Sequence, residues 1–528
     1  MYADLVLLNG EIITFCETKP FAEAIAVKSG KILDVGLNVE IKRYVGENTK
    51  VIDLKGKTAI PGLIDSHIHV GDLAKTLSWI DLHEAKSIEE IKKLIGERVK
   101  NTRKGKWIIG KGWDEGKLAE KRMPSLSDID EVAPENPVVL YRAEGKICVV
   151  NSAALQIVGK SINLSKLEGS LRIKGSQNCE EMKGVLYNSA TDFVWELIPE
   201  MDVEELAELI KIAFDRILEA GITTVQWIAT SLQEAYALVK FIKRGNVPLR
   251  IYLLLPMDVL KTPGLLQELE AFEDEYFKVG GVIFSVDGYL ATKTAALTKP
   301  YMNSKDRGKL FHNSEDIAEL IEKIGKLGLQ VAIHAMGDRA IKETLKAIEE
   351  NELSEKRFRL ETAALLTPKL IRKIAKLKSV IVSIQPYMAY SELTVWKAVE
   401  NLGPRRIRWL YPLKTLFEKG IIVAGGTDSP MEPLNIFSHI KAAVTWIQRE
   451  RIEIYDALKM YTLNAAHAMC AEKMKGSIEI SKLADITVLS ENPLTTKKEK
   501  IDEIKIEFTM VGGKIVYLNP SSDIEIQS

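Results

Sequence analysis

The chain has 528 residues, of which 46% are hydrophobic and 27% are charged, so it is too long for one small domain and too apolar to be mostly disordered. Its 72 Lys and Arg nearly balance 73 Asp and Glu, which excludes the excess of positive charge that binding to a row of phosphates requires. Nucleic acid is therefore not an expected partner.

The N-terminus and the cysteines exclude further classes. Asp4 stands where a secretory signal needs positive charge, and no run approaches the about 20 apolar residues that cross a membrane. We therefore expect a cytoplasmic protein with no membrane partner. The 4 cysteines lie far apart, in a pattern typical of neither a disulfide framework nor a cysteine-rich zinc site. Any metal ion would then be bound by histidine and carboxylate.

The first predicted elements are short strands in residues 1–57. Two strand-like runs flank Asn9-Gly10, a dipeptide typical of a β-hairpin turn. Residues 474–528, at the other end of the chain, also have the strand pattern, with Gly512-Gly513 as a turn between two runs. We predict that both ends of the chain build one β-sandwich.

Between these ends, short apolar runs alternate with helical patterns, which is typical of parallel strands joined by helices. Eight such runs predict a (β/α)8 barrel, or TIM barrel, whose chemistry lies at the carboxyl ends of its strands. The barrel should comprise residues 58–71 and 200–473, and residues 72–199 should form a large insertion that covers the barrel mouth. The predicted strands are Leu63–Ser66, Thr223–Trp227, Arg250–Leu255, Val282–Val286, Leu329–His334, Arg357–Thr362, Val380–Ile384 and Ile421–Gly425.

The strongest local motif is His67-Ile68-His69, at the end of the first predicted barrel strand. Residues two apart in an extended segment face the same side, so the two imidazoles can bind one ion. The alternative is an unrelated pair of surface or core histidines. Placement at a barrel strand end favours the metal-binding interpretation.

Two later strands end on residues that can complete this site. His334 ends the fifth predicted strand, and Asp428 follows the eighth in the run Gly425–Pro430. A single histidine of this kind is more often a hydrogen-bonded structural residue, and a single aspartate more often caps a turn or helix. Together with His67 and His69, they offer three imidazoles and one carboxylate, a donor set suited to Zn²⁺ or a similar divalent ion.

These motifs resemble the amidohydrolase superfamily, most closely its branch of formamide-deformylase-like and cytosine-deaminase-like metal hydrolases. The resemblance implies a metal-dependent hydrolase in which metal-activated water attacks a non-peptide C–N bond of a small molecule, in an amide, formamide or cyclic amidine. Asp428 would be both metal ligand and catalytic residue, because it would take the proton of that water and pass it to the departing nitrogen. The resemblance also covers Thr462-Leu463-Asn464-Ala465-Ala466, Gly476-Ser477-Ile478-Glu479 and Ala484-Asp485.

Three positions depart from the usual pattern of this branch. The run Val282–Val286 has no lysine that could be carbamylated to bridge two metals, Thr362 replaces a histidine, and Lys146 replaces another. We therefore expect one ion, most suitably zinc. Thr362 can donate a hydrogen bond but cannot shuttle a proton at neutral pH.

The remaining candidates would bind the substrate or support a ligand. Lys146, Asp287 and Lys293 are the candidate substrate-binding residues, and each lysine could hold an anionic group or an oxyanion. Either lysine could equally be an ordinary solvated residue. Arg359 and Glu361 would form an ion pair that orients a metal ligand, or a purely structural pair.

Two classes of function stay open. The retained ligand positions favour a metal hydrolase with one ion and a small-molecule substrate, whereas the replaced positions favour a catalytically impaired relative that binds a small molecule. A metal-dependent isomerase or decarboxylase is a third alternative. A homo-oligomer is compatible with the sequence.

Overall fold

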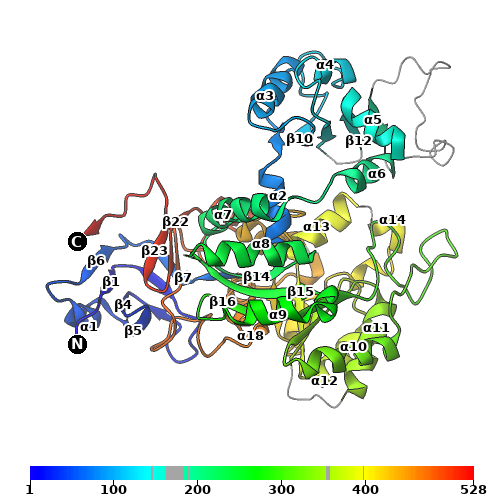
Figure 1. Ribbon diagram of the computed structural model, residues 1–528. Helices are drawn as coiled ribbons and strands as arrows, with labels where there is room; N and C mark the ends of the chain where they lie inside the picture. The colour runs from blue at the N-terminus through cyan, green and yellow to red at the C-terminus, as the bar shows by residue number, and fades with distance from the viewer. Residues whose placement is uncertain are drawn as a thin grey trace. The chain divides into compact units, whose positions relative to one another are not determined.

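The computed structural model describes residues 1–143, 147–161, 184–187, 189–245, 247–351, 357–396, 398–446 and 448–527. Contacts divide the chain into two compact units (Figure 1), one formed by Met1–Leu73 with Ile210–Ser528 and the other by Ala74–Leu209. In the part of the chain that the structure describes, no helix combines the length and apolar character needed to cross a membrane.

The first unit contains an eight-stranded sheet in the order β20-β19-β18-β17-β16-β15-β14-β8, in which all neighbouring strands are parallel. The two edge strands, β8 and β20, are joined at their carboxyl ends by two hydrogen bonds. The Asp428 amide donates to the His67 carbonyl at 2.7 Å, and the His69 amide donates to the Ser429 carbonyl at 3.0 Å. This arrangement confirms the predicted (β/α)8 barrel. The strands are β8 (Leu63–Ile68), β14 (Ile222–Ile228), β15 (Arg250–Pro256), β16 (Phe277–Ser285), β17 (Gln330–Ala335), β18 (Phe358–Thr362), β19 (Val380–Ile384) and β20 (Val423–Gly425).

Amphipathic helices connect these strands, and α10 illustrates why. Asn313 caps its amino end by accepting a hydrogen bond from the Asp316 amide at 2.9 Å, and Ile317, Ile321 and Ile324 form its buried stripe. The other helices of the barrel are α8 (Leu232–Lys243), α9 (Pro263–Glu270), α11 (Asp338–Glu350), α12 (Pro368–Lys376), α13 (Pro386–Thr394), α14 (Ala398–Leu402), α15 (Leu413–Glu418), α16 (Ile436–Lys441), α17 (Ile454–Met460) and α18 (Leu463–Ala468), with α10 spanning Ser314–Lys326.

Both ends of the chain contribute to two further sheets of the first unit. One has the order β24-β6-β1-β4-β5 and the other the order β23-β22-β21-β7-β2-β3. Apolar side chains from the two sheets, among them Leu7, Val27, Val488 and Phe508, share one buried core. The strands are β1 (Leu5–Leu8), β2 (Glu11–Ile13), β3 (Phe21–Ala22), β4 (Ala24–Lys28), β5 (Lys31–Gly36), β6 (Lys50–Asp53), β7 (Thr58–Pro61), β21 (Ile486–Leu489), β22 (Ile506–Val511), β23 (Lys514–Leu518) and β24 (Ile526–Gln527), and α1 (Asn38–Ile41) follows β5.

The hairpin predicted at Asn9-Gly10 is wrong. β1 pairs with β4 and β6, whereas β2 pairs with β3 and β7, so the Asn9-Gly10 turn carries the chain from one sheet to the other. The turn at Gly512-Gly513 does close a hairpin, because β22 and β23 are antiparallel partners and both glycines have positive φ. β7 also extends the sandwich to Pro61, beyond the predicted boundary at residue 57.

The second unit, Ala74–Leu209, has its own sheet in the order β13-β12-β11-β10-β9. Ile91, Ile95, Trp113 and Leu140 lie in its buried core. This unit overlaps the predicted insertion, residues 72–199, but extends to Leu209. Its elements are β9 (Ile80–Asp81), α3 (Ile88–Lys100), β10 (Ile108–Trp113), α4 (Leu126–Asp130), β11 (Val138–Arg142), β12 (Ile147–Val150), α5 (Ser152–Ser161), β13 (Val185–Tyr187) and α6 (Ser189–Leu197), and the helices α2 (Val70–Leu77) and α7 (Val203–Glu219) include its first and last residues.

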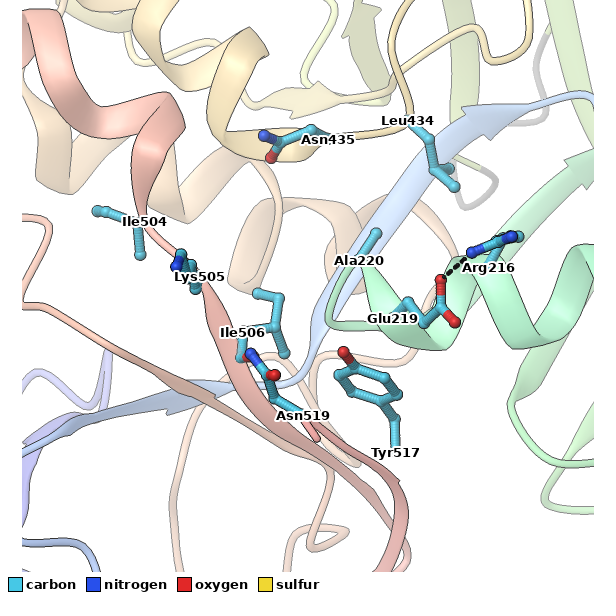
Figure 2. A pocket seen from close by; sticks show the side chains of 10 residues that line it. All are labelled: Arg216, Glu219, Ala220, Leu434, Asn435, Ile504, Lys505, Ile506, Tyr517 and Asn519. Atoms are coloured by element: carbon cyan, nitrogen blue, oxygen red, sulfur yellow. Dashed lines mark hydrogen bonds and ion pairs between the residues drawn. The ribbon is translucent and has the colours of Figure 1, made fainter. Parts of the chain in front are cut away.

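A pocket of about 420 Å³ opens in the first unit at the end of α7, beside strands β22 and β23 (Figure 2). Its lining includes Arg216 and Glu219, whose charged groups pair at 2.8 Å, and Tyr517. None of the predicted site residues lines this pocket.

Candidate functional site

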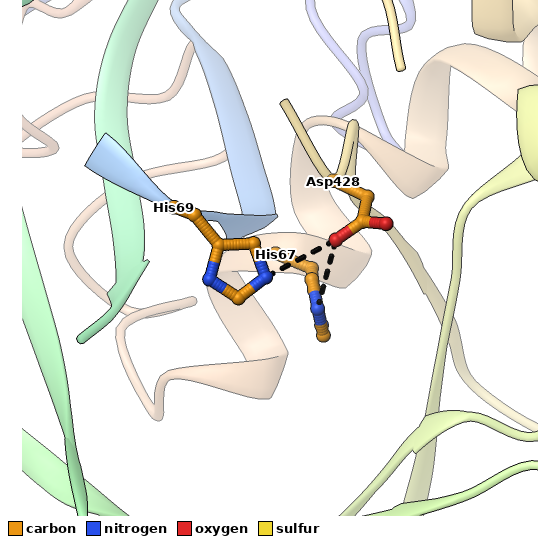
Figure 3. Close-up of side chains that lie close together, drawn as sticks. All are labelled: His67, His69 and Asp428. Atoms are coloured by element: carbon orange, nitrogen blue, oxygen red, sulfur yellow. Dashed lines mark ion pairs between the residues drawn. The ribbon is translucent and has the colours of Figure 1, made fainter. Parts of the chain in front are cut away.

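Three of the four predicted metal ligands meet at the carboxyl ends of β8 and β20. One ligand atom from each of His67, His69 and Asp428 lies within 4.8 Å of the other two (Figure 3). The Nε2 atoms of His67 and His69 lie 3.5 and 3.1 Å from the same carboxylate oxygen, Asp428 Oδ1. Two imidazole nitrogens and a carboxylate oxygen that converge in this way fit a divalent cation such as Zn²⁺.

A buried aspartate that the sequence analysis missed brings these two strand ends together. Asp65, in β8, accepts hydrogen bonds from the Thr427 hydroxyl at 2.5 Å, the Thr427 amide at 3.0 Å and the His67 amide at 3.0 Å. Gly426 is also required here, since a Cβ atom at this position would lie 2.4 Å from the Cβ atom of His67. Asp428 itself adopts a positive φ of 60°, in the left-handed region.

Glu361 orients the ring of His67 by contacting its Nδ1 atom. Its Oε2 atom lies 2.7 Å from His67 Nδ1, and its Oε1 atom accepts from Arg359 Nε at 2.6 Å. Burial raises the pKa of Glu361, but the charge of Arg359 and the hydrogen bond from His67 outweigh it and lower the pKa to about 2. An ionised Glu361 accepts the Nδ1 proton of His67, which leaves the Nε2 lone pair free to face a cation.

Arg359, the ion partner of Glu361, has further hydrogen bonds of its own. It is fully buried and donates to the carbonyl of Ser66 at 2.5 Å and to the side-chain carbonyl of Gln226. The ion pair expected from the sequence is therefore formed, and its carboxylate contacts one of the candidate ligands.

His69 has an equivalent support. Its Nδ1 atom lies 3.2 Å from the carbonyl oxygen of Ile228, at the end of β14, so that Nε2 again faces Asp428. Burial lowers the pKa of His69, but the hydrogen bond and the charge of Asp428 raise it to about 9. The same Nε2 and Oδ1 atoms could bind a divalent cation once the ring has lost that proton.

His334, the fourth predicted ligand, lies in β17 directly opposite Glu361 in the register of the sheet. It is outside the 4.8 Å group, yet it is buried, and its Nδ1 atom has no hydrogen-bond partner among the described residues. Burial and the nearby His67 lower its pKa to about 4, so the ring is neutral. A neutral ring with an unpartnered nitrogen can still bind a metal, and His334 stays a predicted ligand.

The predicted substrate-binding residues have different surroundings. Asp287 accepts hydrogen bonds from the backbone amides of Ala296 at 2.7 Å, Met336 at 2.9 Å and Gly337 at 2.8 Å, which indicates that it organises the loops after β16 and β17. Its contact with substrate stays a prediction.

The two predicted substrate-binding lysines and the replaced position Thr362 are placed as follows. Lys293 is exposed in the loop after β16. Lys146 lies outside the described residues. Thr362 is buried at the end of β18 with a positive φ of 67°, which is rare for a β-branched residue and costs conformational energy.

Further buried polar side chains lie in the segments that follow β19 and β20. Polar atoms of Gln385, Glu392, Tyr411 and Glu432 have no hydrogen-bond partner among the described residues. Of these four residues, only Gln385 could have been singled out from the sequence, because it directly follows an apolar strand. The other three lie in no recognisable motif.

The fold and the cluster together define a class of protein, namely a (β/α)8-barrel protein with a candidate metal centre at the carboxyl ends of its strands. Comparison with known families agrees with this class. The model of the amidohydrolase family matches residues 50–517, so the chain belongs to the amidohydrolase family.

Individual relatives match almost the whole chain. It is 30% identical to protein LONG AFTER FAR-RED 3 of Arabidopsis thaliana, over 98% of this chain and 92% of that protein. It is 25% identical to the N-substituted formamide deformylase of Arthrobacter pascens, over 97% of this chain and 98% of that enzyme. Its structure is similar to that of an uncharacterized metal-dependent hydrolase from Pyrococcus furiosus, with a TM-score of 0.77 and 31% identity over 93% of this chain and 100% of that chain.

Proposed function

We propose that the protein hydrolyses a non-peptide carbon–nitrogen bond of a small molecule, with one divalent metal ion, preferably zinc, bound by His67, His69 and Asp428 and with His334 as the predicted fourth ligand. The observation that carries this proposal is that both Nε2 atoms approach one oxygen of Asp428 while both Nδ1 atoms are engaged by other groups. The similarity to a formamide deformylase and to a metal-dependent hydrolase supports the same reaction class.

The residues of the centre have separate tasks. A divalent ion, when bound, makes water a stronger acid and so supplies a nucleophile near neutral pH. Burial raises the pKa of Asp428, but the hydrogen bond and charge of His69 lower it below its usual value, so the carboxylate is ionised. Asp428 can then accept a proton from water and donate it to the departing nitrogen. Glu361 and the Ile228 carbonyl keep the two rings oriented.

Metal content provides the first test of this proposal. We expect about one zinc ion per chain in protein prepared with zinc. The substitutions His67→Ala and His69→Ala should each remove it, whereas His83→Ala, which changes an exposed histidine in the second unit, should not. A metal content that does not depend on His67 or His69 would contradict the proposed centre.

Hydrolysis provides the second test. A panel of N-substituted formamides, carboxamides and cyclic amidines, assayed by release of amine or ammonia, should contain at least one substrate. With that substrate, Asp428→Asn should lower the rate by about 10²–10⁴-fold, since it removes the proton acceptor. A rate unchanged by this substitution would argue against the role of Asp428.

A catalytically impaired protein that binds a small molecule is the second candidate. The observation in its favour is Thr362, a residue without proton-transfer ability that is buried in a strained conformation at a strand end. Binding of the metal without turnover of any compound in the panel would favour this candidate.

A further inference from the structure

Two buried glutamates lie in segments that follow neighbouring strands of the barrel. Glu392 belongs to α13, after β19, and Glu432 lies in the loop after β20. They are 0% and 6% exposed, and three of their four carboxylate oxygens have no hydrogen-bond partner among the described residues. A buried carboxyl group needs a bound proton, a hydrogen-bond donor or an opposite charge to offset the cost of burial, and the described residues supply no donor to these three oxygens.

The two glutamates are neighbours of each other and of the metal centre. The hydroxyl of Ser391, which precedes Glu392, hydrogen-bonds to Glu432. The amide of Glu432 donates to the carbonyl of Asp428 at 3.4 Å, so Glu432 lies one turn of chain from a candidate metal ligand. Burial, reinforced by the charge of Glu432, raises the pKa of Glu392 to about 8. No lysine or arginine of the described chain is among the groups that shift either pKa.

Another buried polar side chain in the described part of the chain also lacks a partner. The hydroxyl of Tyr411 is fully buried and has no hydrogen-bond partner among the described residues. Burial, together with the negative charges of the two glutamates and Asp428, raises the pKa of Tyr411 well above its usual value. The hydroxyl is thus a buried polar group, without a partner in the described chain, in negatively charged surroundings.

Aromatic rings border the cluster. Tyr387, one turn before Ser391 on α13, has its ring 5.3 Å from that of Trp446 and 5.6 Å from that of His439. Burial and the charge of Glu432 raise the pKa of Tyr387, and Tyr387 lies on the same helix as Glu392. Aromatic faces attract cations, and they favour organic cations over small, strongly hydrated metal ions.

We infer that Glu392, Glu432 and Tyr411 recognise a cationic nitrogen group of the substrate, such as an ammonium, amidinium or guanidinium. This inference rests on the proposed function, because it assigns the substrate class of the same site. A planar amidinium or guanidinium carries several N–H donors and a positive charge, so it can satisfy two carboxylates and a hydroxyl at once. A neutral apolar group would leave the same oxygens unpaired, and an anion would be repelled.

Direct binding of a matched pair of probes tests this inference without turnover. Benzamidinium and benzamide have nearly the same shape, but only the first is charged at neutral pH. Isothermal titration calorimetry of the whole protein should show benzamidinium binding at least about tenfold more tightly than benzamide, as expected for charge-assisted hydrogen bonds. Equal affinity of the two probes, or no binding of benzamidinium, would overturn the inference.

Substitutions locate the binding. Glu392→Gln and Glu432→Gln keep the shape of each side chain and should each weaken benzamidinium binding by about 10–100-fold. Glu418→Gln, at a side chain that is 62% exposed on α15, removes the same charge and should leave binding unchanged. Should one of the buried variants fail to fold, the other variant and the selectivity of the wild-type protein decide the question. Affinity that survives both buried substitutions would refute the assignment.

Two further measurements separate the remaining outcomes. If Mg²⁺ or K⁺ competes with benzamidinium, and benzamidinium binds no more tightly than benzamide, the cluster binds an inorganic cation and the inference is overturned. Because calorimetry measures binding and needs no turnover, failure of hydrolysis leaves the binding result intact. Conversely, if both glutamine variants hydrolyse neutral amides at the wild-type rate, the proposed function stands but the cationic substrate class is refuted.

Discussion

His67 Nδ1 lies 2.7 Å from Glu361 Oε2, and this contact decides which nitrogen of the histidine can face a metal ion. Glu361 is ionised because Arg359 lies 2.6 Å from its other oxygen, in a site from which water is excluded. Arg359 and Glu361 therefore together determine that the proton of His67, a candidate metal ligand, lies on Nδ1.

Glu361→Gln should weaken metal binding without emptying the centre. The amide has no charge to attract the Nδ1 proton of His67, so the ring loses its fixed proton position, and metal affinity should fall by about 10–100-fold. Competition with a chromogenic zinc chelator measures this change. The exposed variant Glu418→Gln provides the control, and equal affinity in the two variants would contradict the role of Glu361.

Arg359→Met should destabilise the protein by about 3–5 kcal/mol, because it leaves the carboxylate of Glu361 buried without its ion partner. Urea denaturation followed by circular dichroism measures the free energy of unfolding. The double variant Arg359→Met with Glu361→Gln removes both charges and should recover much of the loss. If the double variant is no more stable than the single one, the cost does not arise from the unpaired charge.

Asp485→Asn should destabilise the protein while leaving the chemistry unchanged. Asp485 accepts from Arg250 at 2.8 and 3.0 Å and from Lys475 at 3.0 Å, and all three side chains are buried. Loss of the carboxylate leaves two buried cations, with an expected cost of about 3–5 kcal/mol. Arg250 begins β15, at the amino ends of the barrel strands, opposite the end that carries the candidate centre.

For Asp485→Asn, zinc content and hydrolysis per folded molecule should therefore equal those of the wild type. A selective loss of zinc at full stability would show that this cluster acts on the metal centre instead of on stability.

Glu392→Gln should change how stability depends on pH. Burial raises the pKa of Glu392 to about 8, against 4.5 for an ordinary glutamate, so the folded protein binds a proton that the unfolded chain has released. Its contribution to stability is fully present below pH 4.5 and is lost as the pH rises to about 8. The glutamine variant lacks this titration.

The difference in unfolding free energy between wild type and Glu392→Gln should accordingly shift in favour of the variant between pH 5 and pH 8, by on the order of a few kcal/mol. Urea titrations at several pH values, without cationic ligands, measure it. A difference that stays constant over this range would indicate that Glu392 has an ordinary pKa.

Local patterns in the sequence predicted the barrel well. The prediction of Val380–Ile384 coincides with β19, because a strand covered on both faces needs a continuous apolar run. His67 and His69 were found for a related reason, since the alternation of an extended chain determines which side chains share a face. The failure at Asn9-Gly10 has the opposite cause. A turn signal describes the turn itself and not the partners of the flanking strands, which here come from distant segments.

The sequence by itself determined the order of the strands, the His-x-His pair and the aspartate after the last strand, because each depends on residues close together in the chain. Only the tertiary structure decided that Asp65 binds Thr427 across 362 positions and that Glu361 supports His67 across 294. It also decided that Glu392, Tyr411 and Glu432 are buried with polar atoms that lack a partner among the described residues. The physical reason is that closing the barrel brings the ends of distant strands together, and no local pattern of charge or hydrophobicity encodes which polar groups then become neighbours.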